Sequence, residues 1–362
     1  MTSKMKKIQT IIFLFSIGLL LLSAISYSYI YAGENVIHVR YDKNTVNAEQ
    51  LDQYYEQYRE EKTALKKKAG DVPEVTLWNL QERLNVTEGE YFSETDFSLI
   101  EGYGNLEKIL PGRRLDGMYP PKGDTQGCAV SDAGARALFG SSDVVGKNLT
   151  VNKKEYVIRG VIKEKRNMLW IQNPDADGFS YLEMVYQGRT AASAAESWLI
   201  RLGLPVPDAV LAGGDYSAFN FLFLTLPVWV FIIYGYVMLK RQIGMVQIVY
   251  FRKVLLVLWG IGLTALIFAG IRCSFRFSLD YIPKRWSDFS FYQMKAEELI
   301  QAAGGISELK LLPGDAELIK HSRNSAYLAW ASLLLMGGAR LLKAGPGCQQ
   351  SADVCCGSER DT

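Results

Sequence analysis

Two stretches of the 362-residue chain carry residue types that bind phosphate or metal ions in other proteins. Residues 140–148 hold two glycines and a lysine in the order of a phosphate-binding loop, whose backbone N–H groups cradle phosphates. Five residues separate Gly140 from Gly146 where that loop has four, and Asn148 stands where a Ser or Thr hydroxyl would bind Mg²⁺. We therefore expect Gly146 and Lys147 to form a turn and to bind no nucleotide.

The stretch 173–178, taken with Glu183, alternates oxygen-bearing side chains around a glycine, as a calcium loop does. The glutamate arrives one residue early and Pro174 interrupts the pattern, so an Asx-rich turn is favoured. The two histidines, His38 and His321, have no ligand or triad partner at a recognisable spacing. The sequence therefore predicts no catalytic residue, no metal site and no cofactor, and a subunit that is not itself an enzyme.

The elements that would position any site are dominated by four stretches without Asp, Glu, Lys or Arg: 8–33, 216–239, 254–271 and 324–339. An α-helix rises 1.5 Å per residue, so roughly 20 residues cross a hydrocarbon core of about 30 Å. The first three stretches are long enough to cross. The fourth reaches that length when Leu341 and Leu342 extend it and the guanidinium of Arg340 lies at the headgroups.

The first stretch has a second interpretation, because lysines followed by an apolar run are also typical of a secretory signal peptide. Its length and the lack of a clear cleavage site favour an uncleaved anchor. Three lysines precede it, and Lys240, Arg241, Arg252 and Lys253 flank the connection 240–253. Because Lys and Arg are enriched on the cytoplasmic side, both segments are expected there. Eight basic residues within 272–323, which would then lie outside, run against this tendency.

We therefore predict an α+β membrane protein with four transmembrane helices and a mixed α/β extracytoplasmic domain between the first and second. It would be a multi-pass protein of the cell membrane with both termini cytoplasmic. The predicted segments are a cytoplasmic tip with the first helix (1–33), the outer domain (34–215), the second helix (216–239), a cytoplasmic loop (240–253), the third helix (254–271), an outer loop (272–323), the fourth helix (324–342) and a cytoplasmic tail (343–362). Cys128 and Cys273 would lie outside, and the sequence leaves a disulfide between them open.

Within the outer domain, the hydropathy pattern switches between strand and helix periods. Residues 36–41 alternate as a strand, and Asn47 with Gln50 forms a capping-box pattern before a helix that ends near Gly70. A polar, acidic stretch follows at 82–96. Further elements are expected as strands at 75–79 and 128–130, a helix at 133–139, and a hairpin of 149–152 with 155–163. In the outer loop, 293–303 is expected as an amphipathic helix.

The charge distribution excludes two further classes of protein. With 40 basic against 38 acidic side chains, the chain lacks the bulk positive charge that holds nucleic acid. The four apolar stretches contain no charged side chain, whereas proton- or ion-coupled carriers need buried charges near the membrane midplane. Energy for any transport would therefore come from another source.

Three motifs lie close together in the sequence of the outer domain. Residues 129–140, Ala-Val-Ser-Asp-Ala-Gly-Ala-Arg-Ala-Leu-Phe-Gly, end in Leu138, Phe139 and Gly140. A Val-Gly-Lys turn follows at 145–147, with Gly146 and Lys147, and the strand 156–161 ends in Gly160 and Val161. Together the motifs resemble the extracytoplasmic core of FtsX and MacB-like ABC transporter permeases, a family that also has one N-terminal span, a large outer domain and then three spans.

The connection after the second predicted helix is also similar to a motif of that family. It reads Arg241, Gln242, Ile243, Gly244, Met245, where the family has Arg-x-Glu-Ile-Gly-hydrophobic, so Gln242 replaces the usual Glu. The resemblance implies that these residues contact the ATPase. Basic residues beside a short inner loop are also common in membrane proteins of every kind.

The resemblance implies the membrane subunit of an FtsX/MacB-like ABC transporter. Such a subunit lies in the lipid bilayer, works with a separate ATP-binding subunit and a second permease chain, and moves its outer domain for export or envelope signalling. The segment 272–323 is longer than the family pattern and has no assigned role. The sequence leaves one alternative open, a membrane-anchored ligand-binding or sensor protein without an ATPase.

Overall fold

The computed structural model of the chain describes residues 3–65, 72–88, 92–110, 113–245, 247–277, 281–283, 285, 290–308 and 312–344. The chain divides into two compact units. The helical unit comprises residues 1–32, 216–277 and 318–362, and the sheet unit comprises residues 33–215 and 278–317.

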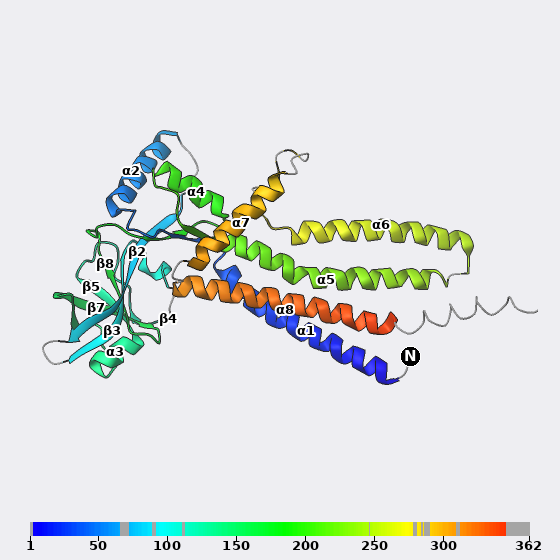
Figure 1. The fold of residues 1–362 in the computed structure, drawn as a ribbon, viewed down its shortest axis with the longest axis horizontal. Helices are drawn as coiled ribbons and strands as arrows, with labels where there is room; N and C mark the ends of the chain where they lie inside the picture. The colour runs from blue at the N-terminus through cyan, green and yellow to red at the C-terminus, as the bar shows by residue number, and fades with distance from the viewer. Residues whose placement is uncertain are drawn as a thin grey trace, which may run out of the picture. The chain divides into compact units, whose positions relative to one another are not determined.

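A mixed β-sheet forms the frame of the sheet unit (Figure 1). Its strands are β1 (Val36–Arg40), β2 (Glu74–Glu88), β3 (Phe92–Tyr103), β4 (Arg113–Gly117), β5 (Gly127–Ser131), β6 (Asn148–Val151), β7 (Lys154–Lys163), β8 (Met168–Gln172), β9 (Tyr181–Val185) and β10 (Ala209–Ala212). Among the described residues their order is β10-β1-β9-β2-β3-β8-β5-β7-β4, and β6 pairs with β2 and β7. Strand β1 is thus held between β9 and β10, antiparallel to both.

Helices close the sheet over separate apolar cores. Helix α2 (Ala48–Leu65) and helix α4 (Ala192–Arg201) bury Leu51 and Trp198 in a core with Val39 of β1 and Leu182 of β9. Helix α3 (Asp132–Phe139) buries Leu138 in a second core with residues of β3, β5, β7 and β8. The short 3₁₀ helix η1 (Leu106–Lys108) follows β3 and contributes to a third core.

Most of the short elements predicted from the sequence are confirmed, among them β1, α3 and the β6–β7 hairpin. The predicted capping box is also present, because the backbone N–H of Asn47 donates to the side chain of Gln50 at 3.4 Å. The predicted end of that helix near Gly70 lies outside the described residues. Helix α7 (Ser290–Glu308) contains the expected amphipathic segment.

The polar stretch 82–96, for which the sequence predicted no element, lies largely in the long antiparallel pair of β2 and β3. Register shifts between Gln81 and Leu84 and between Leu84 and Val86 interrupt this pair. Arg83 sits at the first of them with a φ of 60°. A bulge breaks the two-residue alternation of a strand, which is why the pattern was not recognised.

The helical unit contains α1 (Ser3–Ala32), α6 (Val249–Ser274) and most of α5 (Gly213–Ile243) and α8 (Pro313–Ala344). Three segments are long and apolar enough to cross a membrane: Thr10–Ala32, Gly213–Lys240 and Val249–Ser274. These are three of the four predicted transmembrane helices. Helix α8 begins with charged residues and is not among them.

Two pairs of buried serines join α1 to α8, which run side by side in Figure 1. The hydroxyl of Ser16 donates to the carbonyl oxygen of Ser332 at 2.9 Å, and the hydroxyl of Ser332 donates back to the carbonyl oxygen of Ser16 at 3.0 Å. Ser23 and Ser325 exchange the same pair of bonds at 2.8 and 3.3 Å. Small side chains let the two backbones approach, and the paired hydroxyls leave no polar group unsatisfied.

This seam yields a prediction for stability. The double substitution Ser16→Ala with Ser332→Ala removes two interhelical hydrogen bonds, each worth about 0.6 kcal/mol in membrane helices. The free energy of unfolding in detergent should therefore fall by about 1 kcal/mol, measured by thermal or denaturant unfolding of the full chain. Thr264→Val is the control, because the exposed Thr264 donates a hydrogen bond to the carbonyl oxygen of Gly260 in its own helix. An equal loss in the control would contradict the assignment.

Candidate functional site

The predicted ATPase-contacting residues lie at the end of helix α5 and at the start of its connection to the next helix of the helical unit. Helix α5 ends at Ile243, and the N–H of Gly244 donates to the carbonyl oxygen of Lys240 at 3.1 Å. Helix α6 then begins at Val249. Met245, Ile248 and Tyr250 are 74%, 67% and 80% exposed. Within the chain alone, the connection and the start of α6 therefore leave apolar side chains exposed, as the candidate membrane helices also do.

The hairpin of α5 and α6 is held firmly just behind this turn. The hydroxyl of Tyr236 donates to the carbonyl oxygen of Trp259 at 3.2 Å, and the indole N–H of Trp259 donates to the carbonyl oxygen of Tyr236 at 3.0 Å. The ammonium of Lys240 lies 5.2 Å from the centre of the Trp259 ring. Gly262 leaves the space that the Tyr236 hydroxyl occupies. A force on the turn would thus act on both helices together.

The motif residues of the outer domain build one corner of the sheet unit. The hydroxyl of Ser131 caps α3 by accepting the N–H of Gly134, and Gly140 ends the helix in the left-handed region at φ 69°. Gly146 is also left-handed, at φ 88°. The ammonium of Lys147 lies 5.0 Å from the centre of the Phe139 ring, so the ends of the motif meet.

The other motif residues, Leu138, Gly160 and Val161, lie inside. Leu138 and Val161 are buried in the same core. A Cβ at Gly160 would stand 2.5 Å from the backbone oxygen of Met118, so only glycine fits between β7 and the segment after β4. The motif therefore sets the folding of this corner. It offers no reactive side chain.

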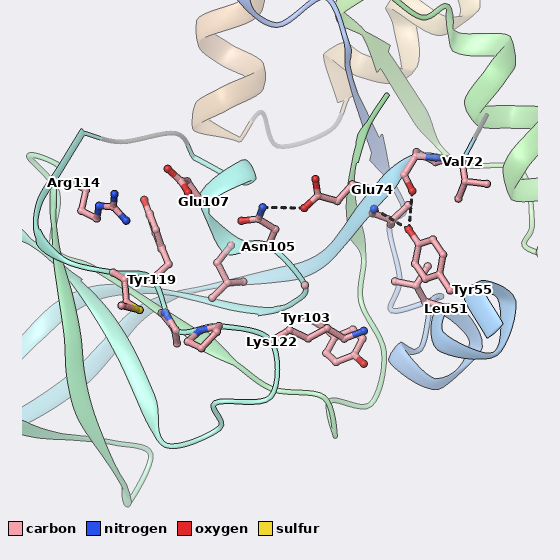
Figure 2. A pocket seen from close by; sticks show the side chains of 17 residues that line it. Leu51, Tyr55, Val72, Glu74, Tyr103, Asn105, Glu107, Arg114, Tyr119 and Lys122 are labelled. Atoms are coloured by element: carbon pink, nitrogen blue, oxygen red, sulfur yellow. Dashed lines mark hydrogen bonds between the residues drawn. The ribbon is translucent and has the colours of Figure 1, made fainter. Parts of the chain in front are cut away.

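A cavity of about 610 Å³ lies between α2, the ends of β2 and β3, and the segment 118–122 (Figure 2). Its walls are largely apolar and aromatic, with Leu51, Tyr55, Tyr103 and Tyr119 among them. The Tyr55 hydroxyl is occupied, since it donates to the carbonyl oxygen of Pro73 at 2.8 Å and accepts the N–H of Val75 at 3.0 Å. A cavity of this size and lining matches small-molecule sites.

An ion pair closes one side of this region. The ammonium of Lys122 lies 2.7 Å from a carboxylate oxygen of Asp52 on α2, and the Tyr103 hydroxyl donates to the same carboxylate. Burial opposes the charge on Asp52, but the hydrogen bonds from Lys122 and Tyr103 outweigh it and hold the pKa of this carboxyl below its usual range. The pair is therefore charged at neutral pH and ties α2 to the segment 118–122.

Four ionisable side chains meet deep in the sheet unit. Arg40 of β1 donates from Nε and a terminal nitrogen to both carboxylate oxygens of Asp315, at 2.9 and 2.7 Å. It also donates to Glu183 of β9 at 2.9 Å. His38, next on the same face of β1, has its Nδ1 against the second oxygen of Glu183. Arg40, Glu183 and Asp315 are all at least 96% buried, with exposed fractions of 4%, 1% and 2%.

The sequence alone missed this cluster. It found no partner for His38 and placed Glu183 only in a failed calcium loop, because Glu183 and Asp315 are 143 and 275 residues from Arg40 along the chain. The one local signal was that His38 and Arg40 share a face of a strand whose other face is apolar. Cys128 and Cys273, between which the sequence left a disulfide open, lie in different units and are both free thiols in the structure. Burial raises the pKa of the Cys128 thiol to about 12.

The glycines of the motif give a second prediction. Gly140→Ala adds a Cβ that meets nothing but must hold a left-handed φ, so the free energy of unfolding should fall by about 1 kcal/mol. Gly160→Ala presses against backbone that cannot move cheaply, so the loss should reach about 3 kcal/mol. Urea unfolding of the full chain in detergent measures both. Equal losses, or a larger loss at Gly140, would show that the close approach at Gly160 does not matter.

Comparison with known proteins gives a family for this fold. Residues 8–202 match the family model described as the MacB-like periplasmic core domain. Comparison with curated proteins found no match.

Three solved structures are similar in part. The periplasmic region of MacB from Actinobacillus actinomycetemcomitans is 12% identical, with a TM-score of 0.40 over 51% of this chain and 91% of that one. The extracellular domain of the noncanonic ABC-type transporter YknZ from Gram-positive bacteria is 16% identical, with a TM-score of 0.36 over 47% and 96%. A domain of a putative permease from Porphyromonas gingivalis is 12% identical, with a TM-score of 0.34 over 47% and 83%. Because the family model covers more than half of the residues, the chain belongs to the FtsX/MacB-like ABC transporter permease family, with a MacB-like periplasmic core domain.

Proposed function

We propose that this chain couples ATP hydrolysis by a separate ATPase to movement of its own extracytoplasmic domain, for export or envelope signalling. The observation that carries the proposal is the exposed apolar turn between α5 and α6, on a chain whose sheet unit is a MacB-like core domain. Residues 241–245 of the turn would be the contact with the ATPase. The chain itself would be non-catalytic.

Helix α8 is proposed as the fourth membrane helix. The serine seam places residues 325–332 of α8 level with residues 16–23 of α1, which lie inside an apolar segment able to cross a membrane. With 32 residues, α8 is about 48 Å long, well beyond a hydrocarbon core of about 30 Å. Its charged first turns would then lie outside the hydrocarbon, and the segment 324–342 would cross it. With the lysines before α1 and the cations around 240–253, four crossings would put both termini in the cytoplasm.

A second permease chain is part of the proposal. In the three apolar segments, only 11%, 6% and 6% of the residues are buried within the chain. Helices so little covered by their own chain must contact lipid or other helices over most of their surface. Four membrane helices in one chain would enclose no path for a substrate, so transport would require a dimer, formed with an identical or a related chain.

The mechanical route follows the connectivity. A push on the turn would move the α5–α6 hairpin as one piece, because Tyr236 and Trp259 bond it reciprocally. Helix α5 begins directly after β10, so its movement reaches the sheet without an intervening loop. For such coupling, the ATPase must bind the two states of the permease with different affinity.

The sensor alternative has one observation in its favour, the cavity between α2 and segment 118–122. Its volume and aromatic walls suit a small ligand. A sensor without an ATPase would bind its ligand there and leave the α5–α6 turn without a protein partner. The two functions therefore differ in whether an ATPase is recovered with the chain.

The test is a detergent pull-down of the tagged chain from membranes of the source cell, with identification of the recovered ATPase and an ATP hydrolysis assay. Ile243→Asp and Gly244→Arg place charge in the turn. Loss of a central interface contact costs about 2 kcal/mol or more, so recovery should fall at least about tenfold with each variant. Val206→Asp is the matched control, because Val206 is an apolar residue of the sheet unit that is 87% exposed; it should recover the ATPase as the native chain does.

Two outcomes would count against the proposal. If the native chain is monodisperse and recovers no ATPase, the transport function is wrong, and ligand binding by the sheet unit becomes the function to test. If both turn variants recover the ATPase as well as the Val206→Asp control, the ATPase contact lies elsewhere on the chain.

A further inference from the structure

The inference concerns the ion cluster of Arg40, Glu183 and Asp315, and it rests on the function proposed above. Asp315 lies in the first turn of α8, within the segment 272–323 that the family resemblance left without a role. Both of its carboxylate oxygens accept from Arg40, in a fork with two N–H donors. Such paired bonds fix orientation as well as distance.

The guanidinium has no freedom to turn away. Two of its three remaining N–H donors go to Glu183 at 2.9 Å and to the carbonyl oxygen of Val39 at 3.1 Å. Its carbon lies 5.5 Å from the Trp78 ring centre and 5.4 Å from that of Tyr181. The Trp78 indole N–H in turn donates to Glu183 at 3.2 Å. Arg40 is thus held at its edges by oxygens and at its faces by rings.

The start of α8 has a second attachment in the sheet unit. Leu312, directly before the helix, is 2% exposed and packs in the core of Trp78, Ile109 and Trp170. The N–H of Ala316 donates to the carbonyl oxygen of Leu312 at 2.9 Å, which joins this apolar contact to the helix. The apolar contact of Leu312 alone would allow the start of α8 to shift along the sheet. The paired hydrogen bonds between Arg40 and Asp315 form in one alignment of helix and strand.

Strand β1, whose Arg40 bonds to Asp315, and its neighbour β10 are also close in sequence to two other helices, α1 and α5. Strand β1 begins four residues after the end of α1, and the N–H of Val36 bonds back to the carbonyl oxygen of Gly33 at 3.0 Å. Its neighbour β10 leads directly into α5. The end of α1 and the start of α5 are thus joined to the β1–β10 pair by the chain itself. The start of α8 is joined to β1 by the Arg40–Asp315 ion pair.

We infer that Arg40 and Asp315 form a joint that transmits movement of α8 to strand β1 of the extracytoplasmic sheet. The outer segment 272–323 would exist, at least in its last part, to deliver Asp315 to this joint. Arg40 and Asp315 are positioning residues here: they contact neither ATP nor substrate, and they act by keeping helix and sheet in one register. If the Arg40–Asp315 fork is broken, the ATPase should still bind, but its nucleotide state should no longer change the conformation of the sheet.

The experiment measures hydrogen exchange of the amides of β1, β10 and the first turns of α8, in the native complex with its co-purified ATPase, with and without a non-hydrolysable ATP analogue. Asp315→Asn removes the charge with little change of shape, and Arg40→Lys keeps the charge but loses the fork. Glu317→Gln is the matched control, an exposed carboxylate in the same part of α8. Both variants are measured in parallel, and ATPase recovery and tryptophan fluorescence report on assembly and folding.

In the native complex and in Glu317→Gln, the nucleotide should change the exchange rates of β1 and α8. Allosteric coupling is typically worth roughly 5- to 150-fold, so the nucleotide-dependent ratio should fall about tenfold in Asp315→Asn and less in Arg40→Lys. A merely stabilising pair predicts something else: faster exchange in the variants by the same factor with and without nucleotide. That result would overturn the joint, as would an unchanged ratio in whichever variants fold. If the native chain recovers no ATPase, it is the proposed function that fails.

Discussion

The charge of Arg40 is buried inside the sheet unit and is paired with two carboxylates from distant parts of the chain. Burial by itself would lower the pKa of the guanidinium, but the charges of Glu183 and Asp315 outweigh that effect and hold the pKa above its usual range. Removing one carboxylate leaves charge buried without a partner, which typically costs several kcal/mol. The contact joins β1, β9 and the start of α8 within the sheet unit, in addition to the β1–β9 ladder and the packing of Leu312.

Polar contacts tie α8 to N-terminal parts of the chain in each unit. In the helical unit, the serine pairs fix the register of α8 on α1. In the sheet unit, the fork from Arg40 fixes the first turn of α8 on β1, the strand that follows α1. Both sets lie among apolar groups, where a shifted register would leave donors and acceptors unsatisfied. Apolar packing gives each unit its cohesion, and these polar pairs select one alignment.

The sequence predicted what depends on short-range patterns. Strand β1, helix α3 with its Ser131 and Gly140 caps, and the β6–β7 hairpin each follow from residues within a few positions of one another. The Leu-Phe-Gly and Val-Gly-Lys motifs carried the family for the same reason, because they describe one local corner. The pairing of β2 with β3 was missed where the bulges near Arg83 break the alternation.

Local sequence patterns did not predict the long-range contacts that align one helix or strand with another. Ser16 and Ser23 are seven residues apart, as are Ser325 and Ser332, and this matched spacing was the available signal for the seam. Nothing comparable marks Asp315 as the partner of Arg40, since one strand end and one helix start meet across 275 residues. The cavity escaped prediction because its walls come from α2, the ends of β2 and β3, and the segment 118–122.

The distribution of stiffness along the chain bears on how such a protein would work. An α-helix carries its backbone hydrogen bonds within itself, so force applied at one end is transmitted along the axis unless a kink absorbs it. Helix α5 contains Pro227, a residue that interrupts this ladder, whereas α8 has no proline after Pro313 at its first position. Of α5 and α8, α5 carries an internal proline and α8 does not. A helix can pass on force only if its end is held, and in the joint inferred above the buried fork at Asp315 would hold the end of α8.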